Sequence, residues 1–186
     1  MCLKYNISRE MSAKGKIKKI GFDLDGVIIN KPPFVPMFVM DLLVRSRRNK
    51  GLSYRFPNTK LERFVRWFSH SPVFRPPIEK NINLIHELYK NKNYELYVVS
   101  SRYSFLDKRT KQWFDYHCLD GLFKKIHINL NNEQPHKFKE KMIKKLDLNV
   151  FIDDDLPLLN YLKSRIKNID LLYMEDNKSV IGNIGK

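Results

Sequence analysis

The chain has 186 residues, 42% of them hydrophobic and 30% charged, and its formal net charge at pH 7 is +15. This length suits a single domain with a small insertion and argues against two full domains. No stretch of sequence approaches the roughly 20 consecutive apolar residues that cross a bilayer, so we expect a soluble protein without a membrane partner.

The N-terminal segment, residues 1–16, is polar and has no regular pattern, so we expect a flexible tail. It lacks the apolar stretch and the cleavage site of a signal peptide. The two cysteines, Cys2 and Cys118, are too few for a disulfide framework. These features together predict a cytoplasmic protein.

The basic charge has two explanations. Clustered Lys and Arg side chains bind nucleic acid through release of counterions, so nucleic acid stays open as a partner. The chain is also rich in Lys, Asn and Ile and has Ala13 as its only alanine, a bias typical of an A/T-rich genome. We favour the second explanation, and in either case the charge suits an anionic substrate.

The first predicted element is a buried strand in the apolar run that starts near Ile17 and ends in a turn at Gly26. The sequence pattern then changes: residues 31–77 contain repeated prolines and two helix-like stretches, at 36–48 and 59–70. We therefore interpret residues 31–77 as an insertion.

The second helix-like stretch has an apolar face. Leu61, Phe64, Val65 and Phe68 follow helical spacing, and we expect these side chains to belong to the core rather than to bind a ligand.

From residue 78 onward, helical and alternating apolar patterns follow one another. Helices are predicted at 78–91, 104–117, 137–146 and 156–166, and strands at 95–101, 124–130, 149–153 and 170–174. Such alternation predicts an α/β fold, with a parallel sheet, helices on both faces and right-handed crossovers.

Two carboxylates follow the first predicted strand. Asp23 and Asp25 are separated by one residue, so in extended chain both side chains point the same way. One carboxylate can then attack a substrate while the other transfers protons. The alternative is a solvated turn, since Asp followed by Gly is common in turns.

Two further candidates could bind phosphate. Ser100 and Ser101 end a valine-rich strand, where a hydroxyl and backbone N–H groups can hold a phosphate oxygen, although a plain hydroxyl cap is the alternative. Lys139 is predicted at a helix start, where its ammonium could neutralise a phosphate and a nucleophile, and Lys137 is the second choice.

Three consecutive carboxylates, Asp153, Asp154 and Asp155, follow another apolar strand. Adjacent carboxylates repel one another unless a cation or hydrogen-bond donors compensate them, and a metal ion is the simplest remedy. The alternative is that they favour the start of the next helix through its dipole.

Taken in order, FDLDGV, a strand ending VVSS, a helix-start Lys and a strand ending FIDDD resemble the four motifs of the haloacid dehalogenase (HAD) superfamily. The resemblance covers residues 17–30 and 78–174. It implies a Rossmann-like parallel sheet as a core domain of residues 17–30 and 78–186, with a small helical cap of type one at 31–77.

The resemblance also implies roles for individual residues. Asp23 would be the nucleophile and Asp25 the acid and base, and both would contribute to a Mg²⁺ site with Asp154, Asp25 through a nearby backbone carbonyl. The choice between Asp153 and Asp154 at the ion is not fixed by sequence. Substrate phosphate would be bound by Ser100 and Lys139, and from its place at the strand end we expect Ser101 to take part as well.

We therefore expect a magnesium-dependent phosphomonoester hydrolase that acts through an aspartyl phosphate, on a nucleotide or another small phosphate ester. One alternative is a polynucleotide-end phosphatase, in which arginines of the insertion meet a nucleic-acid end. Another is a non-catalytic, basic nucleic-acid-binding protein on the same fold. The sequence leaves the substrate and the oligomeric state open.

Overall fold

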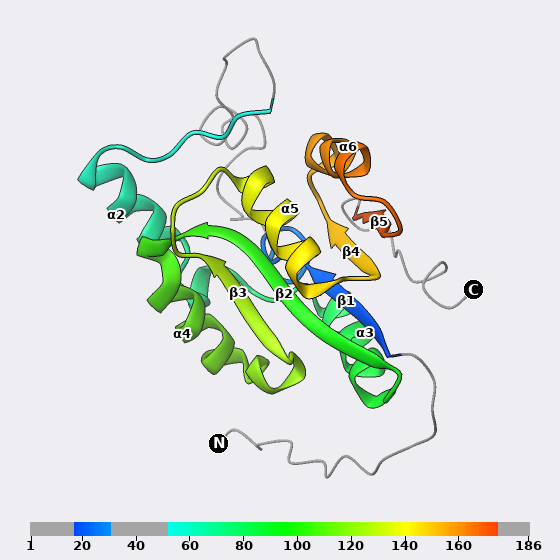
Figure 1. The fold of residues 1–186 in the computed structure, drawn as a ribbon. Coiled ribbons are helices and arrows are strands. Elements are labelled where there is room, and N and C mark those ends of the chain that lie inside the picture. The colour runs from blue at the N-terminus through cyan, green and yellow to red at the C-terminus, as the bar shows by residue number, and fades with distance from the viewer. Residues whose placement is uncertain (1–16, 31–51, 175–186) are drawn as a thin grey trace.

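The computed structural model describes residues 17–30 and 52–174 (Figure 1). The predicted tail at 1–16 and the first helix-like stretch of the insertion, at 36–48, lie outside these ranges. Within them, no helix combines the length and the apolar character that crossing a membrane requires.

The core is a sheet of five parallel strands in the order β3-β2-β1-β4-β5. The strands are β1 (Lys18–Phe22), β2 (Tyr94–Tyr103), β3 (Lys125–Asn129), β4 (Val150–Asp153) and β5 (Asp170–Tyr173). β1 lies in the middle, between β2 and β4, so its carboxyl end is flanked by the ends of two other strands (Figure 1). The predicted α/β class and parallel sheet are confirmed.

Helices cover both faces of the sheet, as predicted. They are α3 (Glu79–Lys90), α4 (Asp107–His117), α5 (Pro135–Leu146) and α6 (Leu156–Arg165). Buried side chains of α3 and α4 join one hydrophobic cluster, and those of α5 and α6 join the other.

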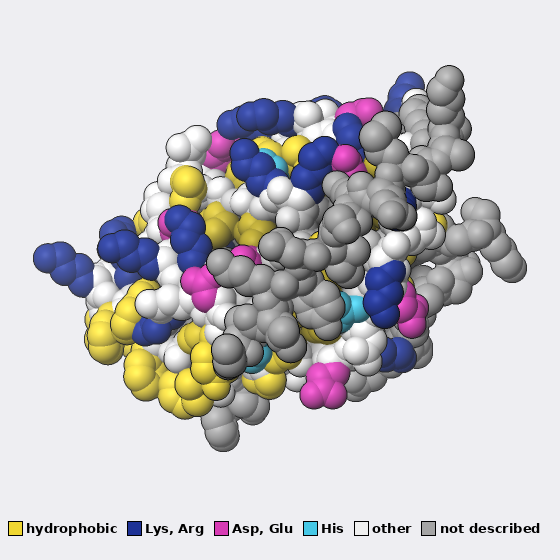
Figure 2. Space-filling model, turned by 90° about the horizontal axis from the view of Figure 1, so that it is seen from below, with side chains coloured by type: hydrophobic (Ala, Val, Ile, Leu, Met, Phe, Trp, Pro, Cys, Tyr) yellow, Lys and Arg dark blue, Asp and Glu magenta, His cyan; other side chains and the backbone are white. Residues whose placement is uncertain are grey.

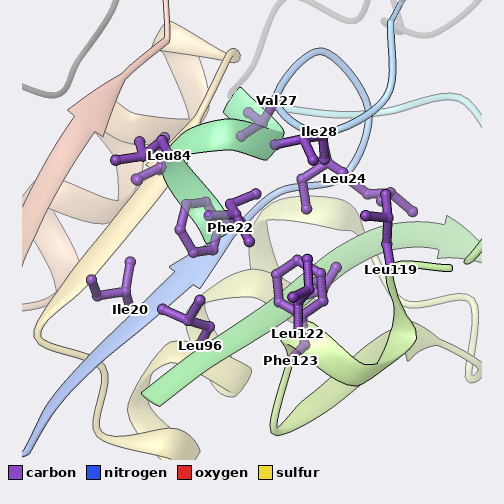
Figure 3. Close-up of a cluster of buried hydrophobic side chains, with 14 of the residues drawn as sticks. Ile20, Phe22, Leu24, Val27, Ile28, Leu84, Leu96, Leu119, Leu122 and Phe123 are labelled. Carbon is purple, nitrogen blue, oxygen red and sulfur yellow. The ribbon is translucent and has the colours of Figure 1, made fainter. Parts of the chain in front are cut away.

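The strands divide their side chains between these clusters with the period of two that extended chain imposes. On β1, Ile20 and Phe22 face the α3 and α4 side. On β4, Ile152 faces that side while Phe151 faces α5 and α6. Figure 3 shows the first cluster, in which Phe22 lies close to side chains of the neighbouring elements.

Two boundaries differ from the sequence prediction. β2 does not end at Ser101 but continues to Tyr103, and its pairing with β3 shifts register after Ser100. Helix α5 begins at Pro135, which favours a helix start because its ring fixes φ and it has no N–H to leave unpaired. Lys139 therefore lies in the second turn rather than at the start of the helix.

Helix α2 (Lys60–Ser69) confirms the second helix-like stretch of the insertion. Thr59 and Glu62 form a capping box, in which each side chain accepts a hydrogen bond from the other residue's backbone N–H. The helix is followed by a short 3₁₀ turn, η1 (Pro72–Phe74).

The prediction that the apolar face of α2 belongs to the core is wrong. None of the helix's residues is buried, and the exposed fractions of Leu61, Phe64, Val65 and Phe68 lie between 53% and 72%. Helical periodicity shows that a face is apolar but not that the fold covers it. Figure 2 shows apolar side chains gathered along one edge of the molecule, whereas Lys and Arg side chains are spread over the visible face.

The chain leaves the core for the insertion and returns to it at one place. The N–H of Asn30 donates to the carbonyl of Pro76 (3.0 Å), and the N–H of Ile78 donates to that of Ile28 (2.9 Å). These bonds bring the two predicted boundaries of the insertion side by side. Treating the insertion as a separate cap stays a prediction.

Candidate active site

Asp23 is the first residue after β1, and the pairing of β1 with β4 determines its surroundings. Phe22 pairs with Ile152, and the N–H of Asp23 donates to the Ile152 carbonyl (2.9 Å). The next residue on β4 is Asp153, so the two carboxylates leave neighbouring strands at the same level. Both are buried.

Lys139 lies between these two carboxylates. Its Nζ is 2.9 Å from Asp23 Oδ1 and 2.7 Å from Asp153 Oδ2, and the side chain is buried. Burial would lower the pKa of Lys139, but the two carboxylates outweigh it and raise that pKa, so the ammonium stays charged. Lys137, the second choice from the sequence, is exposed on the same helix.

The three consecutive aspartates have different environments. Asp153 accepts a hydrogen bond from Lys139 and another from the N–H of Asp155 (3.0 Å). Asp155 caps α6 by accepting from the N–H of Leu158, so the helix-start alternative applies to this aspartate.

Asp154 projects across the turn at Gly26. Gly26 has a φ of +83°, and a Cβ added there would overlap the carboxylate of Asp154. The glycine is thus required twice, by its own conformation and by the close approach of this side chain.

Asp23, Asp153 and Asp154 form a group that can hold a metal ion, since one carboxylate oxygen of each lies within 4.8 Å of the others. Three carboxylates and one ammonium leave a formal charge of −2, which a divalent cation would balance. Burial, together with the adjacent carboxylates, raises the pKa of Asp23 well above its ordinary value even though Lys139 lowers it. An all-oxygen donor set of this charge fits Mg²⁺.

The carboxylate of Asp25 does not belong to this group of described side chains. Both of its oxygens are bound by arginines: Arg102 donates from Nε to Oδ2 and from Nη2 to Oδ1, and Arg75 donates from Nη2 to Oδ1, each at 2.7 Å. The metal-binding group contains both Asp153 and Asp154, between which the sequence did not decide. A backbone carbonyl near Asp25 as a ligand stays a prediction.

The two arginines keep Asp25 ionised. Burial would raise its pKa, but Arg102 and then Arg75 outweigh burial and hold the pKa of Asp25 well below its ordinary value. The side chains of Arg75 and Arg102 are only 3% exposed, whereas the side chain of Asp25 is 34% exposed. The aspartate is therefore the member of this cluster that solvent or a substrate can reach.

Sequence reasoning missed Arg75 and Arg102. Arg102 had a usable signal, since it lies two residues beyond Ser100 in extended chain and so projects to the same side. Arg75 had none, because it lies in an irregular segment and is 50 residues from its partner Asp25.

The predicted phosphate-binding serines lie beside this cluster. Ser100 is buried and its Oγ accepts a hydrogen bond from the N–H of Arg102 (3.3 Å), while Ser101 is half-buried. Their contact with phosphate stays a prediction.

The insertion reaches the core on the other side of the site as well. The hydroxyl of Tyr54 donates to Asp155 Oδ2 (2.6 Å). The backbone of Tyr54 also exchanges two hydrogen bonds with the side chain of Gln134, the residue before α5. The helices that follow Gln134 and Asp155 are thus both tied to the insertion.

No protein-family model and no curated protein sequence matches the chain. Solved structures do. A haloacid dehalogenase-like family hydrolase from Streptococcus pneumoniae superposes with a TM-score of 0.52 and 14% identity, over 86% of this chain and 85% of that one. A HAD family enzyme from Bacteroides thetaiotaomicron superposes with a TM-score of 0.58 and 13% identity, over 89% and 97%.

The chain has the haloacid dehalogenase fold. The Bacteroides enzyme is an aspartate-to-alanine mutant in complex with magnesium and inorganic phosphate. The HAD fold of this chain also matches a chain of the Pnkp1/Rnl/Hen1 RNA repair complex, with a TM-score of 0.56 and 9% identity, over 92% of this chain and 47% of that one. In this HAD fold, Asp23 and the metal-binding group lie where parallel sheets bind ligands, at the carboxyl ends of the strands.

Proposed function

We propose that this chain is a magnesium-dependent phosphomonoester hydrolase of the HAD superfamily with Asp23 as its nucleophile. The observation that carries the proposal is the arrangement of Asp23, Lys139, Asp153 and Asp154 at the end of the central strand. The magnesium and phosphate in the Bacteroides structure of the same fold support it.

Asp23 suits covalent catalysis. Its carboxylate attacks phosphorus, the bond from phosphorus to the leaving oxygen breaks, and an aspartyl phosphate forms. Water then attacks this phosphorus, the acyl phosphate bond breaks, and phosphate and the Asp23 carboxylate are released. Lys139, 2.9 Å from Asp23 Oδ1, stabilises negative charge during both steps.

Mg²⁺ would be held by the carboxylates of Asp23, Asp153 and Asp154, and when bound it neutralises the charge that otherwise repels a phosphate dianion from this site. The protein's own contribution is to hold the three oxygens together, through β1, β4 and the turn at Gly26.

Asp25 is the proton-transfer residue of the proposal. As a carboxylate it can take the proton of the attacking water in the second step and release it to solvent, while the leaving oxygen of the first step takes up its proton from solvent. The arginines favour the ionised form, so the free protein is prepared for the step that needs a base.

Mutation of Asp23 tests the proposed function. With purified protein, Mg²⁺ and an aryl phosphate, we expect Asp23→Asn to lower kcat by at least about a thousandfold. Asp115→Asn, which changes an exposed aspartate of α4, is the matched control and should retain full activity. Comparable turnover by the Asp23→Asn protein would refute a covalent role for this carboxylate.

The second candidate, a polynucleotide-end phosphatase, is favoured by one surface feature. Phe64, 60% exposed, lies parallel to Trp67 (24° between the rings), and the Arg109 guanidinium lies 3.5 Å over the Trp67 ring. Exposed rings beside a cation are typical of sites that stack single-stranded bases. The RNA repair complex of similar fold supports the same reading.

A substrate comparison separates the candidates. For a polynucleotide phosphatase, Phe64→Ala should raise KM for a phosphorylated oligonucleotide about tenfold and leave an aryl phosphate unaffected. Tyr116→Ala removes an equally exposed ring of α4 and serves as control. We favour a small phosphate ester, for which neither substitution changes KM, because composition accounts for much of the basic charge.

A further inference from the structure

Asp25 is held by more positive charge than pairing requires. Its Oδ1 accepts from two guanidinium groups and its Oδ2 from one. Arg102 alone donates a hydrogen bond to each carboxylate oxygen and balances the negative charge. Arg75 adds a second cation, so the cluster carries a formal charge of +1.

Burying a second guanidinium beside the first is unfavourable, since each charge must leave water and the two repel. The cluster also affects His70 at the end of α2: burial, followed by Arg102, lowers the pKa of His70 to about 3, so this ring stays neutral near pH 7. A second guanidinium on a carboxylate that Arg102 already binds through both oxygens points to a role at the site.

Arg75 is held rigidly from both sides. Its Nε donates to the carbonyl of Asn30 (2.8 Å), and its own carbonyl accepts from the indole N–H of Trp113 (2.6 Å). Asn30 and Arg75 stand at the two ends of the insertion, and Trp113 belongs to core helix α4. The guanidinium therefore reaches Asp25 from a fixed position where the insertion meets the core.

The two arginines come from different parts of the chain. Arg102 belongs to β2 and is supported by Thr110 of α4, whose hydroxyl accepts from Nη1 (3.0 Å). Arg75 belongs to the segment that returns from the insertion. Arg102 fixes both oxygens of Asp25 to the core, and Arg75 fixes Oδ1 to the insertion.

We propose that Arg75 is a positioning residue of the phosphatase site, which occupies Oδ1 of Asp25 and leaves Oδ2 as the oxygen that transfers protons. The proposal rests on the proposed function, since it requires Asp25 to move protons. A carboxylate oxygen has two lone pairs: both of those on Oδ1 are taken by guanidinium donors, and one on Oδ2 stays available. Without Arg75, the carboxylate keeps its charge but can turn away from the water it activates.

An aryl phosphate substrate allows the positioning role of Arg75 to be measured. Its leaving group departs without much protonation, so formation of the aspartyl phosphate needs little help from Asp25. Hydrolysis of that intermediate needs Asp25 as base. A mispositioned Asp25 should therefore slow the second step selectively, and phosphoenzyme should accumulate.

The experiment compares wild type, Arg75→Gln, Arg75→Lys and the exposed control Arg165→Gln with an aryl phosphate and Mg²⁺. We expect Arg75→Gln to lower kcat ten- to a hundredfold, with the Mg²⁺ concentration for half-activation unchanged and a larger fraction of trapped phosphoenzyme. Arg75→Lys, which restores one donor, should lie between Arg75→Gln and wild type. Arg165→Gln should match wild type.

The outcomes separate the possible failures. If wild type shows no turnover that depends on Asp23, the proposed function fails. If wild type is active and Arg75→Gln retains its kcat, the positioning role fails alone. A fall in kcat, Mg²⁺ affinity and melting temperature together, without phosphoenzyme, would indicate a structural role only; should Arg75→Gln not fold, the same comparison is made with Arg75→Lys.

Discussion

At the scale of single residues, chemically identical side chains are distinguished by what they touch. Asp153 is neutralised by Lys139, Asp155 caps a helix, and Asp154 lies across Gly26 beside Asp23. Composition alone makes these three aspartates equivalent. Their separate environments explain how three adjacent carboxylates can be accommodated at one strand end.

Gly26 offers a test of the position of Asp154. Gly26→Ala should displace the Asp154 carboxylate and strain the backbone, because a Cβ there overlaps that side chain and φ is +83°. We expect a higher Mg²⁺ concentration for half-maximal activity and a loss of about 1–2 kcal/mol in the free energy of unfolding. Gly121→Ala is the control, since a Cβ at residue 121 meets nothing within 4 Å. Equal Mg²⁺ requirements in the two variants would contradict the assignment of Asp154 to the metal site.

His70 gives the fold a pH dependence. Burial and the charges of Arg102, Asp25 and Arg75 act on its ring, which also contacts the carbonyl of Arg66 through Nδ1 (2.6 Å). The pKa of His70 is about 3 in the folded protein and 6.5 ordinarily, so only the unfolded state takes up this proton between those values.

The sign follows from that difference. The stabilising contribution is fully present above pH 6.5 and is lost as the pH falls toward 3, at a slope of up to about 1.4 kcal/mol per pH unit. We expect His70→Gln to lose less free energy of unfolding than wild type between pH 7 and pH 4, measured by denaturant titration. Parallel pH profiles for the two proteins would show that His70 is not held neutral.

At the scale of secondary structure elements, α2 shows that local sequence signals can predict a helix without predicting which of its faces is buried. Its capping box and helical spacing are local, and they produce a helix where the sequence indicates one. Its apolar face is nevertheless exposed, because burial depends on what the rest of the chain places against that face. By contrast, α4 buries Trp113 and Phe114 in the core.

Matched phenylalanines of these two helices test this contrast. Phe64→Ala should change the free energy of unfolding by less than about 0.5 kcal/mol, because this ring is 60% exposed. Phe114→Ala should cost about 3–5 kcal/mol, because this ring is 2% exposed within the core. Thermal and denaturant unfolding measure both, and a large loss for Phe64→Ala would mean that its face is covered in solution.

At the scale of the whole molecule, the site lies where separate parts of the chain meet. Asp23, the proposed nucleophile, directly follows β1, Asp153 and Asp154 lie at the end of β4, and Lys139 lies on α5. The described part of the insertion is tied to the core through Arg75 at Asp25 and through Tyr54 at Asp155. This arrangement holds a formal charge of −2 between fixed elements.

The stored negative charge predicts stabilisation by metal. If Mg²⁺ binds the folded site and not the unfolded chain, it should raise the melting temperature, with about 2.7 kcal/mol gained at 100 times Kd. A chelator should abolish activity, and Ca²⁺ should substitute poorly for catalysis because it prefers more ligands at longer distances. Asp154→Asn should reduce the thermal shift. A shift of the same size in that variant would place the ion elsewhere.

The sequence by itself determined the alternation of strands and helices, and with it the parallel sheet. Apolar periodicity is a local property, and alternating strands and helices can pack in few ways. It also singled out Asp23, Asp154 and Lys139, which the structure brings to one place, because polar residues that end apolar strands meet at one edge of such a sheet. Their catalytic roles stay predictions.

Only the tertiary structure decided which partners these residues have. The hydrogen bonds to Asp25 come from Arg75 and Arg102, which are distant from it in sequence. Asp153 lies beside Asp23 because of the register in which β4 pairs with β1. The local sequence pattern likewise predicted neither the burial of Lys139 nor the exposure of the apolar face of α2. The physical reason is the same in each case: a pattern fixes the direction of a side chain on its own element, whereas its charge state and contacts depend on segments distant in sequence that folding brings against it.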